Sequence, residues 1–376
     1  MHEALSIDRE KKSVTLRDLE NDSTFQQAYE KLVIATGARA IVPPLPGVDL
    51  EGVFPLKEFQ DGINLKTYLE SKKPEHAVII GGGYIGVEVA ESFRNTGMNV
   101  TLVEAMPRIM AIMDEDMGDL VARKMEANGV RIITGTKVTG LAGSTRVEGV
   151  ELEDGSAIKA DCVLLSIGVA PRSEIARDAG LKLGARGAIL VDRYLRTSDP
   201  DIYAAGDCST VYHRLLCESV FIPLGLTANR QGRICGENIT GELTGGLLKP
   251  FPGIIGTAVT KIFDLEIAKT GIGQTDIERY DLKHIRSTKV KARNLPGYFP
   301  GSAELWVKLY FEDLTGVITG GQIIGGTGSA IRINTLVSAI TQGMRIDELY
   351  TLDTAYAPPI SPVWDPLVIA AKTAMK

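Results

Sequence analysis

Residues 76–86 read HAVIIGGGYIG and decide the fold of the chain. An apolar strand is followed directly by glycines in the pattern G-x-G-x-x-G, at the start of a helix expected over 84–95. In this context the pattern is typical of dinucleotide binding. Gly81 permits a tight turn, Gly83 lets a pyrophosphate approach the backbone, and Gly86 lets helix and strand pack closely. A glycine-rich turn without a ligand is the alternative.

The strand after this helix ends in an acid, Glu104, 23 positions after Gly81. An acid at this place binds the adenosine ribose hydroxyls and repels a 2′-phosphate, so the sequence predicts NADH rather than NADPH. Arg108, four residues later, could soften this preference, and NADPH stays open. A solvated strand end is the alternative for Glu104. Two residues inside the motif, Tyr84 and Ile85, are assigned to the same cofactor site.

The composition describes an ordinary globular protein. The chain has 376 residues, 44% of them hydrophobic and 23% charged, which predicts two or three domains. A net charge of −6 without a long basic tract argues against a nucleic-acid partner, and no long apolar run suggests a membrane span. Four cysteines without a C-x-x-C pattern argue against a disulfide framework or a zinc module. We therefore expect no metal site and a cytoplasmic location.

Alternating strands and helices surround the motif and predict an α/β fold. Strands are expected at 30–37, 76–80, 99–104, 130–134 and 161–167, and helices at 58–72, 84–95, 116–128 and 224–239. Within the last helix, Gly232 and Gly236 are spaced for close packing against another backbone. After residue 253 the pattern changes to strands at 305–311 and 315–324 and a helix at 330–342, which predicts an α+β domain.

Two separated segments share one pattern, an apolar strand that ends in small residues. They are Ala35-Thr36-Gly37, before the nucleotide motif, and Ala205-Gly206-Asp207, after it. The repetition indicates that one nucleotide-binding domain is inserted within another. A turn acid that bonds its own backbone is the alternative for Asp207.

With these segments, the chain resembles the flavin-dependent pyridine nucleotide–disulfide oxidoreductases, whose FAD domain is interrupted by an NAD domain. The resemblance implies two nested Rossmann-like domains, the FAD domain incomplete, plus a C-terminal α+β dimerisation domain. The implied boundaries are 1–74 and 191–249 for the FAD domain, 75–190 for the NAD(P) domain and 250–376 for the dimerisation domain.

The resemblance also assigns the flavin contacts. Asp207 would bond the ribityl chain of FAD, and Thr36 and Gly37 would lie near the junction of the two nucleotide sites. The helix from residue 224 would aim its positive end at the flavin, where reduction accumulates negative charge. Its backbone contacts are assigned to Leu226, Thr227 and Ala228. Two glycines, Gly168 and Gly206, complete the assigned cofactor residues.

The carboxyl-terminal signature, residues 356–366 with 256–263, resembles the dimerisation domain of coenzyme A disulfide reductases, NADH oxidases and peroxidases. No histidine follows His284, so a His–Glu acid/base pair is absent from this part of the sequence. In the coenzyme A reductase branch, two tyrosines of the partner subunit approach the redox cysteine. The matching positions are Tyr298 and Tyr356, whose hydroxyls could stabilise a thiolate. Interface packing is their ordinary alternative.

The chain departs from the family pattern at its start. Family members open with a glycine-rich loop for the FAD pyrophosphate and a Ser-x-x-x-Cys-Gly stretch with the redox cysteine, and neither occurs here. We therefore expect a fragment that lacks this segment and cannot run the thiol half-reaction alone. None of the four cysteines, Cys162, Cys208, Cys217 and Cys235, is expected to replace the missing one.

For the intact protein the resemblance implies a homodimeric flavoenzyme. It would pass a hydride from NADH to FAD and then electrons to a small disulfide such as coenzyme A disulfide. One alternative is an NADH oxidase or peroxidase that ends at oxygen or peroxide. Another is a catalytically silent NAD-binding dimeric fragment.

Overall fold

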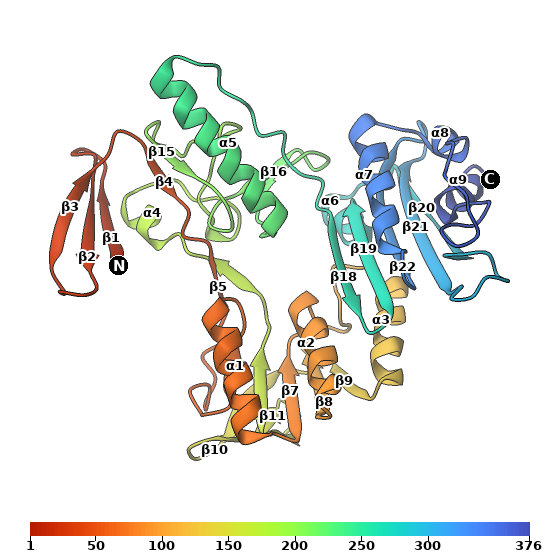
Figure 1. Ribbon diagram of the computed structural model, residues 1–376, viewed down its shortest axis with the longest axis horizontal. Helices are drawn as coiled ribbons and strands as arrows, with labels where there is room; N and C mark the ends of the chain where they lie inside the picture. Colours follow the sequence, from red (N-terminus) through yellow and green to blue (C-terminus); the bar gives the residue numbers. More distant parts are fainter. The chain divides into compact units, whose positions relative to one another are not determined.

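The computed structural model describes residues 1–376 and divides into two compact units. The first unit comprises Met1–Arg39 and Val169–Ile255, and the second comprises Ala40–Gly168 and Gly256–Lys376. Each unit is therefore built from two separated stretches of the chain, which the colours of Figure 1 distinguish. The domain boundaries predicted from the sequence remain predictions.

The first unit holds a parallel pair of short strands. They are β4 (Leu32–Ile34) and β15 (Ile202–Ala204), with Leu32 opposite Ile202 and Ile34 opposite Ala204. The unit also contains the antiparallel sheet β1 (His2–Asp8), β2 (Ser13–Asp18) and β3 (Thr24–Ala28), the pair β5 (Ala38–Ala40) and β14 (Val169–Pro171), the hairpin β16 (Val211–His213) and β17 (Glu218–Val220), and the helices α4 (Glu174–Asp178), η1 (Ala185–Gly187) and α5 (Gly225–Thr244).

The first part of the second unit is a five-stranded parallel sheet in the order β6-β13-β7-β8-β9. Its elements are β6 (Val53–Pro55), α1 (Phe59–Lys72), β7 (His76–Ile80), α2 (Tyr84–Asn95), β8 (Asn99–Glu104), α3 (Glu115–Ala127), β9 (Val130–Thr134) and β13 (Cys162–Leu165). The four residues of β7 after His76 are all buried, as both faces of a parallel strand must be when helices cover the sheet. A small antiparallel sheet, β10 (Val138–Gly143), β11 (Val147–Leu152) and β12 (Ala157–Lys159), is inserted before β13.

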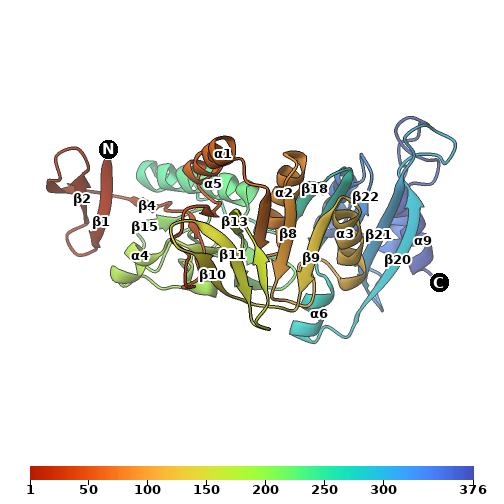
Figure 2. The same ribbon diagram turned by 90° about the horizontal axis from the view of Figure 1, so that it is seen from below.

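The second part of this unit is a five-stranded antiparallel sheet in the order β18-β19-β22-β21-β20. Its elements are β18 (Ala258–Ile262), β19 (Leu265–Gly271), α6 (Gln274–Tyr280), β20 (Ile285–Arg293), β21 (Glu304–Glu312), β22 (Ile318–Gly325), η2 (Ala330–Arg332), α7 (Ile333–Gln342), α8 (Ile346–Tyr350) and α9 (Pro366–Ala374). One hydrophobic core joins both parts of the unit, because Met113, just before α3, and Met117, within it, cluster with Ile267 and Ile324 of the antiparallel sheet. Figure 2 shows α3 between β9 and the strands of this sheet.

The mixed α/β architecture predicted from the sequence is confirmed, and most predicted elements lie within a few residues of the observed ones. The predicted strand 30–37 is shorter, with only Leu32–Ile34 paired. The expected close packing of Gly232 and Gly236 is wrong, since a Cβ atom added at either would meet no heavy atom within 4 Å. None of the helices combines the length and the apolar character that crossing a membrane requires.

Candidate functional site

The turn after β7 contains two glycines, Gly81 and Gly86. Any other residue at either position would force the neighbouring backbone to shift. Gly81 has φ +110°, and its N–H donates to the carbonyl of Val103 at 2.8 Å. An added Cβ on Gly81 would lie 2.5 Å from the carbonyl oxygen of Ser166, and one on Gly86 only 2.0 Å from that of Gly81. Helix α2 therefore approaches the end of β7 as closely as the predicted roles of these glycines require.

Ser166, at the end of the neighbouring strand β13, holds this turn and was missed by the sequence analysis. Its hydroxyl donates to the carbonyl of Gly81 at 2.9 Å and to that of Ile80 at 3.0 Å. The only sequence signal is a small polar residue at the end of a buried apolar run.

Gly83 is the open position of the turn. It is the N-cap of α2, no side chain caps it, and an added Cβ would meet no heavy atom within 4 Å. The first-turn N–H groups of a helix have no carbonyl partner within the helix, so they face an accessible surface here. This arrangement fits an anionic diphosphate at the positive end of α2.

Tyr84 and Ile85, the first residues of α2, are both half-buried. The Tyr84 hydroxyl has no hydrogen-bond partner, and its burial raises the pKa of the phenol well above the ordinary value. Tyr84 therefore stays neutral at physiological pH and presents a ring at the start of the nucleotide helix.

Glu104 lies beside the turn, as predicted, and also takes part in holding it. Its carboxylate accepts from the N–H of Gly82 at 2.7 Å and from that of Met106 at 2.8 Å. Arg108 lies near Glu115, with 3.9 Å between guanidinium and carboxylate, rather than in an ion pair with Glu104. The carboxylate is thus fixed at the edge of the turn, with lone pairs remaining for further donors.

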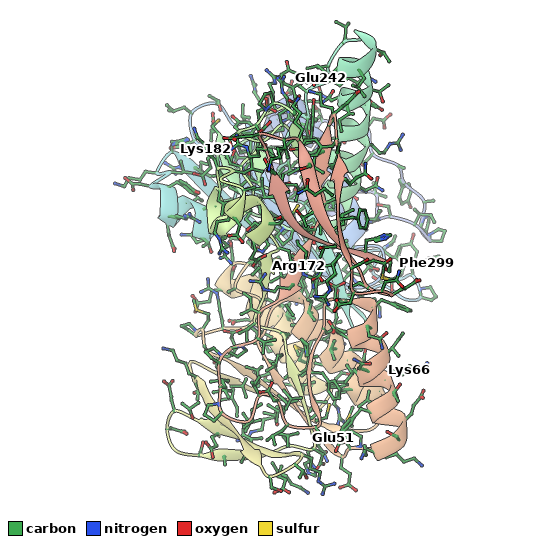
Figure 3. The ribbon with its side chains drawn as sticks, turned by 90° about the vertical axis from the view of Figure 1, so that its left-hand side faces the viewer. Glu51, Lys66, Arg172, Lys182, Glu242 and Phe299 are labelled. Atoms are coloured by element: carbon green, nitrogen blue, oxygen red, sulfur yellow. The ribbon has the colours of Figure 1, made fainter.

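The second crevice lies in the first unit, where β4 and β15 end side by side. The N–H of Ala205 donates to the carbonyl of Ile34 at 3.2 Å, so residues 35–37 and 205–207 are neighbours on one sheet. The Thr36 hydroxyl donates to the carbonyl of Arg172. In turn, the backbone N–H of Arg172 donates to the carbonyl of Gly37 at 2.9 Å. Arg172 is labelled in Figure 3.

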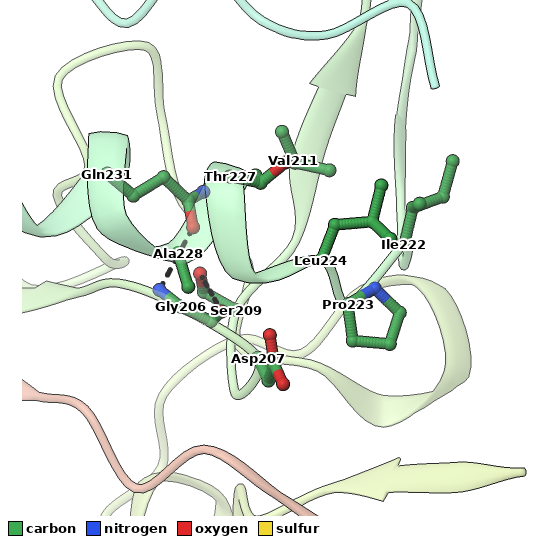
Figure 4. Close-up of a pocket in the computed structure, with 10 residues that line it drawn as sticks. All are labelled: Gly206, Asp207, Ser209, Val211, Ile222, Pro223, Leu224, Thr227, Ala228 and Gln231. Carbon is green, nitrogen blue, oxygen red and sulfur yellow. Dashed lines mark hydrogen bonds between the residues drawn. The ribbon is translucent and has the colours of Figure 1, made fainter. Parts of the chain in front are cut away.

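Gly206 turns the chain toward α5. It has φ +84°, and its N–H donates to the side-chain oxygen of Gln231 at 2.9 Å (Figure 4). Gln231 is 1% exposed, and its amide nitrogen donates to the carbonyl of Thr210 at 3.3 Å. Gln231 was not predicted from the sequence, because nothing local distinguishes a glutamine on a helix.

Asp207 and the start of α5 line one small pocket. Figure 4 shows the Asp207 carboxylate on the side of Pro223 and Leu224, with Thr227 and Ala228 on the first turns of the helix. The Leu226 side chain is 62% exposed and does not line this pocket, so only its backbone can serve as the predicted contact. Gly168, with φ +117°, belongs to the second unit, where its carbonyl accepts from Ile41 at 3.0 Å.

Three of the four cysteines are buried and inert. Burial raises the pKa of the Cys162 thiol to about 12 and that of Cys235 to about 11, and it also raises the pKa of Cys208. The Cys208 thiol contacts the carbonyls of Ile34 and Ala205, each at 3.4 Å. Cys217 is exposed in the β16–β17 hairpin. The buried thiols stay protonated near neutral pH, as expected from the sequence.

Tyr298 and Tyr356 come together on the second unit. Tyr298 lies between β20 and β21, and Tyr356 lies between α8 and α9. They are 76% and 49% exposed, and the interaction with the Tyr298 hydroxyl raises the pKa of Tyr356. Both residues were predicted from the sequence, and the structure places them together.

Comparison with known proteins identifies the family. Residues 1–232 match the family described as pyridine nucleotide-disulphide oxidoreductase, and residues 257–367 match its dimerisation domain. The first match covers more than half of the chain. The chain belongs to the pyridine nucleotide-disulphide oxidoreductase family. The predicted fold class and the predicted enzyme class, a FAD-dependent NAD(P)H oxidoreductase, are confirmed at this level, and the dimerisation-domain match supports a homodimer.

Individual members of the family cover nearly the whole chain. The NAD(P)H sulfur oxidoreductase (CoA-dependent) of Pyrococcus furiosus is 36% identical over 95% of this chain and 79% of its own length. The NADH oxidase of Methanocaldococcus jannaschii is 34% identical over 100% of this chain and 82% of its own length. The crystal structure of reduced Bacillus anthracis CoADR-RHD has a TM-score of 0.94 and 35% identity, covering all of this chain and 66% of that one. The chain thus spans about two thirds of the Bacillus protein.

Proposed function

We propose that these residues form the NADH site, the ribityl side of the FAD site and the dimerisation surface of a reductase that acts on a small disulfide such as coenzyme A disulfide. Bound FAD would accept a hydride from NADH and pass electrons to sulfur. The observation that carries the disulfide proposal is the exposed pair Tyr298 and Tyr356, in which Tyr298 is near enough to raise the pKa of Tyr356. The names of the Pyrococcus and Bacillus relatives support the same substrate class.

The NADH site rests on the turn after β7. Its open Gly83 and the first-turn N–H groups of α2 suit the pyrophosphate, while Glu104 faces the place of an adenosine ribose. A carboxylate held at this place by two backbone N–H groups repels a 2′-phosphate. We therefore propose NADH as the preferred cofactor, with NADPH as the weaker ligand.

The flavin site rests on Asp207 and the start of α5. Asp207 would accept hydrogen bonds from ribityl hydroxyls, and the first-turn N–H groups of α5, near Leu226 and Thr227, would stabilise negative charge on the reduced ring. Thr36 and Gly37 lie on the neighbouring strand end and complete this edge. These contacts fit the ribityl and ring portion of FAD.

The two tyrosines would donate hydrogen bonds to the sulfur atoms of the disulfide. The raised pKa of Tyr356 keeps its phenol protonated at neutral pH, so it can donate a hydrogen bond to a leaving thiolate. Tyr298, which is 76% exposed, can reach a partner subunit. Donation by two phenols would replace the missing acid/base histidine.

A second candidate acceptor is oxygen or peroxide, because the NADH oxidase of Methanocaldococcus jannaschii matches all 376 residues of this chain. An assay on a polypeptide that contains these residues and binds flavin distinguishes the two acceptors. We would compare its rate of NADH consumption with coenzyme A disulfide, oxygen and peroxide. A faster rate with the disulfide supports the proposal, and rates that depend only on oxygen or peroxide overturn it.

The tyrosine pair has a test of its own on the 376-residue chain. In Tyr298→Phe the pKa of Tyr356 should fall toward its ordinary value, because the Tyr298 hydroxyl that raises it is lost. Ultraviolet titration of the phenols measures this shift against Tyr212→Phe as a control. If the pKa of Tyr356 stays unchanged in Tyr298→Phe, the pair has no role in the mechanism.

The cytoplasmic location remains a prediction from the cysteine content.

A further inference from the structure

A buried carboxylate, Asp114, connects the parallel sheet to the antiparallel sheet of the second unit. It is 3% exposed and lies at the N-cap of α3. It accepts hydrogen bonds from the Tyr310 hydroxyl, from Lys308 at 2.5 Å, from the Gln322 amide at 2.6 Å and from the N–H of Gln274 at 3.2 Å. All four donors come from the part of the unit that follows residue 256.

Asp114 stays ionised in this setting. Burial alone would raise the pKa of Asp114, but the Lys308 ammonium and the Tyr310 hydroxyl outweigh it and hold the pKa below the ordinary value. Lys308 also contacts Asp116 at 2.9 Å, so its charge is shared between two acids of the same helix start. Four donors hold a buried carboxylate in one position. Removal of one donor leaves part of its charge without a partner and is strongly destabilising.

The loop that ends at Asp114 is the loop that clamps the nucleotide turn. It begins at Glu104, whose carboxylate accepts from the N–H of Gly82. Six residues later the N–H of Met110 donates to the carbonyl of the same glycine at 2.7 Å. Both backbone groups of Gly82, the middle glycine of the turn, are therefore bonded to the segment between β8 and α3. Ile109 packs so tightly here that a Cβ on Gly82 would lie 2.7 Å from it.

The middle of this loop is under backbone strain. Met110 has φ +50°, a conformation that favours glycine, and its side chain is completely buried. Such a conformation is unfavourable for a residue with a side chain and persists only where the surroundings determine it. The carbonyl of Met110 accepts from the N–H of Met113 at 2.8 Å, and Asp114 follows directly. The anchor for the strained segment is thus the Asp114 contact set.

We propose that Asp114, with Tyr310, Lys308 and Gln322, is a positioning device for the NADH site. It anchors the loop that presents Glu104 to the ribose and holds Gly82 by both backbone groups. NADH affinity and the choice between NADH and NADPH then depend on contacts with the antiparallel sheet β18-β19-β22-β21-β20. This sheet is far along the chain from the nucleotide turn. This inference rests on the proposed NADH site.

The test compares three variants of the 376-residue chain by fluorescence titration with NADH and with NADPH. Tyr310→Phe removes one donor and keeps the ring, and Asp114→Asn removes the charge. Asp365→Asn is the matched control, because Asp365 is also a buried N-cap, 8% exposed, that accepts from Arg332 at 3.0 Å and from the N–H of Leu367 rather than from groups that bond Asp114.

We expect the Kd for NADH to rise about threefold in Tyr310→Phe and about tenfold in Asp114→Asn. The Kd for NADPH should rise less, so the preference for NADH shrinks as Glu104 loosens. Asp365→Asn should lower the thermal unfolding midpoint while both Kd values stay unchanged. If Asp114→Asn does not fold, Tyr310→Phe decides the result alone.

The outcomes separate the two proposals. Failure of the wild-type chain to bind NADH would overturn the NADH site itself. Binding by the wild type with unchanged Kd values in Tyr310→Phe and Asp114→Asn would overturn the positioning role and leave the site intact. An equal rise in the Kd values for NADH and NADPH, or the same rise in Asp365→Asn, would reduce Asp114 to a general stabiliser and also overturn the inference.

Discussion

The two strand-to-helix turns of the chain are closed in different ways. After β7, in a five-stranded sheet, the turn is closed by backbone packing, with Gly86 pressed against the carbonyl of Gly81. After β15, in a two-stranded sheet, Gly206 is held by the side chain of Gln231, and its nearest Cβ contact, to Ala228, is an ordinary 3.5 Å. An added Cβ thus has room at Gly206 and none at Gly86.

The largest expected effect tests the backbone-packed turn. Gly86→Val should weaken NADH binding about 100-fold, because the added atoms collide with the carbonyl of Gly81 and push α2 from the strand. Fluorescence titration with NADH measures the loss. Gly236→Val is the control, since this helical glycine faces open space and should leave binding unchanged. Wild-type affinity in Gly86→Val would mean that the close approach does not matter.

The next effect tests the turn that a side chain holds. Gln231→Leu should lower the free energy of unfolding by about 2 kcal/mol, because the N–H of Gly206 loses its acceptor, the side-chain oxygen of Gln231. Urea unfolding followed by circular dichroism gives the value. Gln60→Leu, at an exposed helix position, should change it by less than about 0.5 kcal/mol. Equal stability of the two variants would contradict the contrast between the turns.

A smaller effect concerns the acid beside the first turn. Glu104→Ala should raise the Kd for NADH about tenfold, because both the ribose contact and the bond to Gly82 are lost. NADPH should lose less, because a repulsive charge disappears at the same time. Parallel titrations with both nucleotides check this, with the exposed Glu126→Ala as control. An unchanged ratio of the two Kd values would assign the preference elsewhere.

The smallest effect distinguishes strain from collision. Gly206→Ala should cost about 1 kcal/mol of unfolding free energy, because φ is +84° but an added Cβ has room. Gly232→Ala, in the open face of α5, should instead stabilise by about 1 kcal/mol through helix propensity. Thermal unfolding of both variants gives the two signs. A much larger loss of unfolding free energy in Gly206→Ala, as a collision would cause, would contradict the room that an added Cβ has at this turn.

Much of the first turn could be predicted from the sequence because its determinants are local. Strand, glycines and helix follow one another within 20 residues, 76–95, and the acid Glu104 closes the next strand. The second turn was found from a repeated pattern, and the pairing of β4 with β15 places its two halves together. The wrong expectation for Gly232 and Gly236 shows the limit of this reasoning, since glycine spacing on a helix does not say what lies opposite.

By itself, then, the sequence determined the α/β order of elements, the dinucleotide turn and the acid beside it, because each depends on neighbours along the chain. Only the tertiary structure decided which groups hold those turns in place. Ser166 reaches Gly81 across 85 residues, and Tyr310 reaches Asp114 across 196. Such contacts form only when packing brings distant strands together, and no local periodicity encodes them.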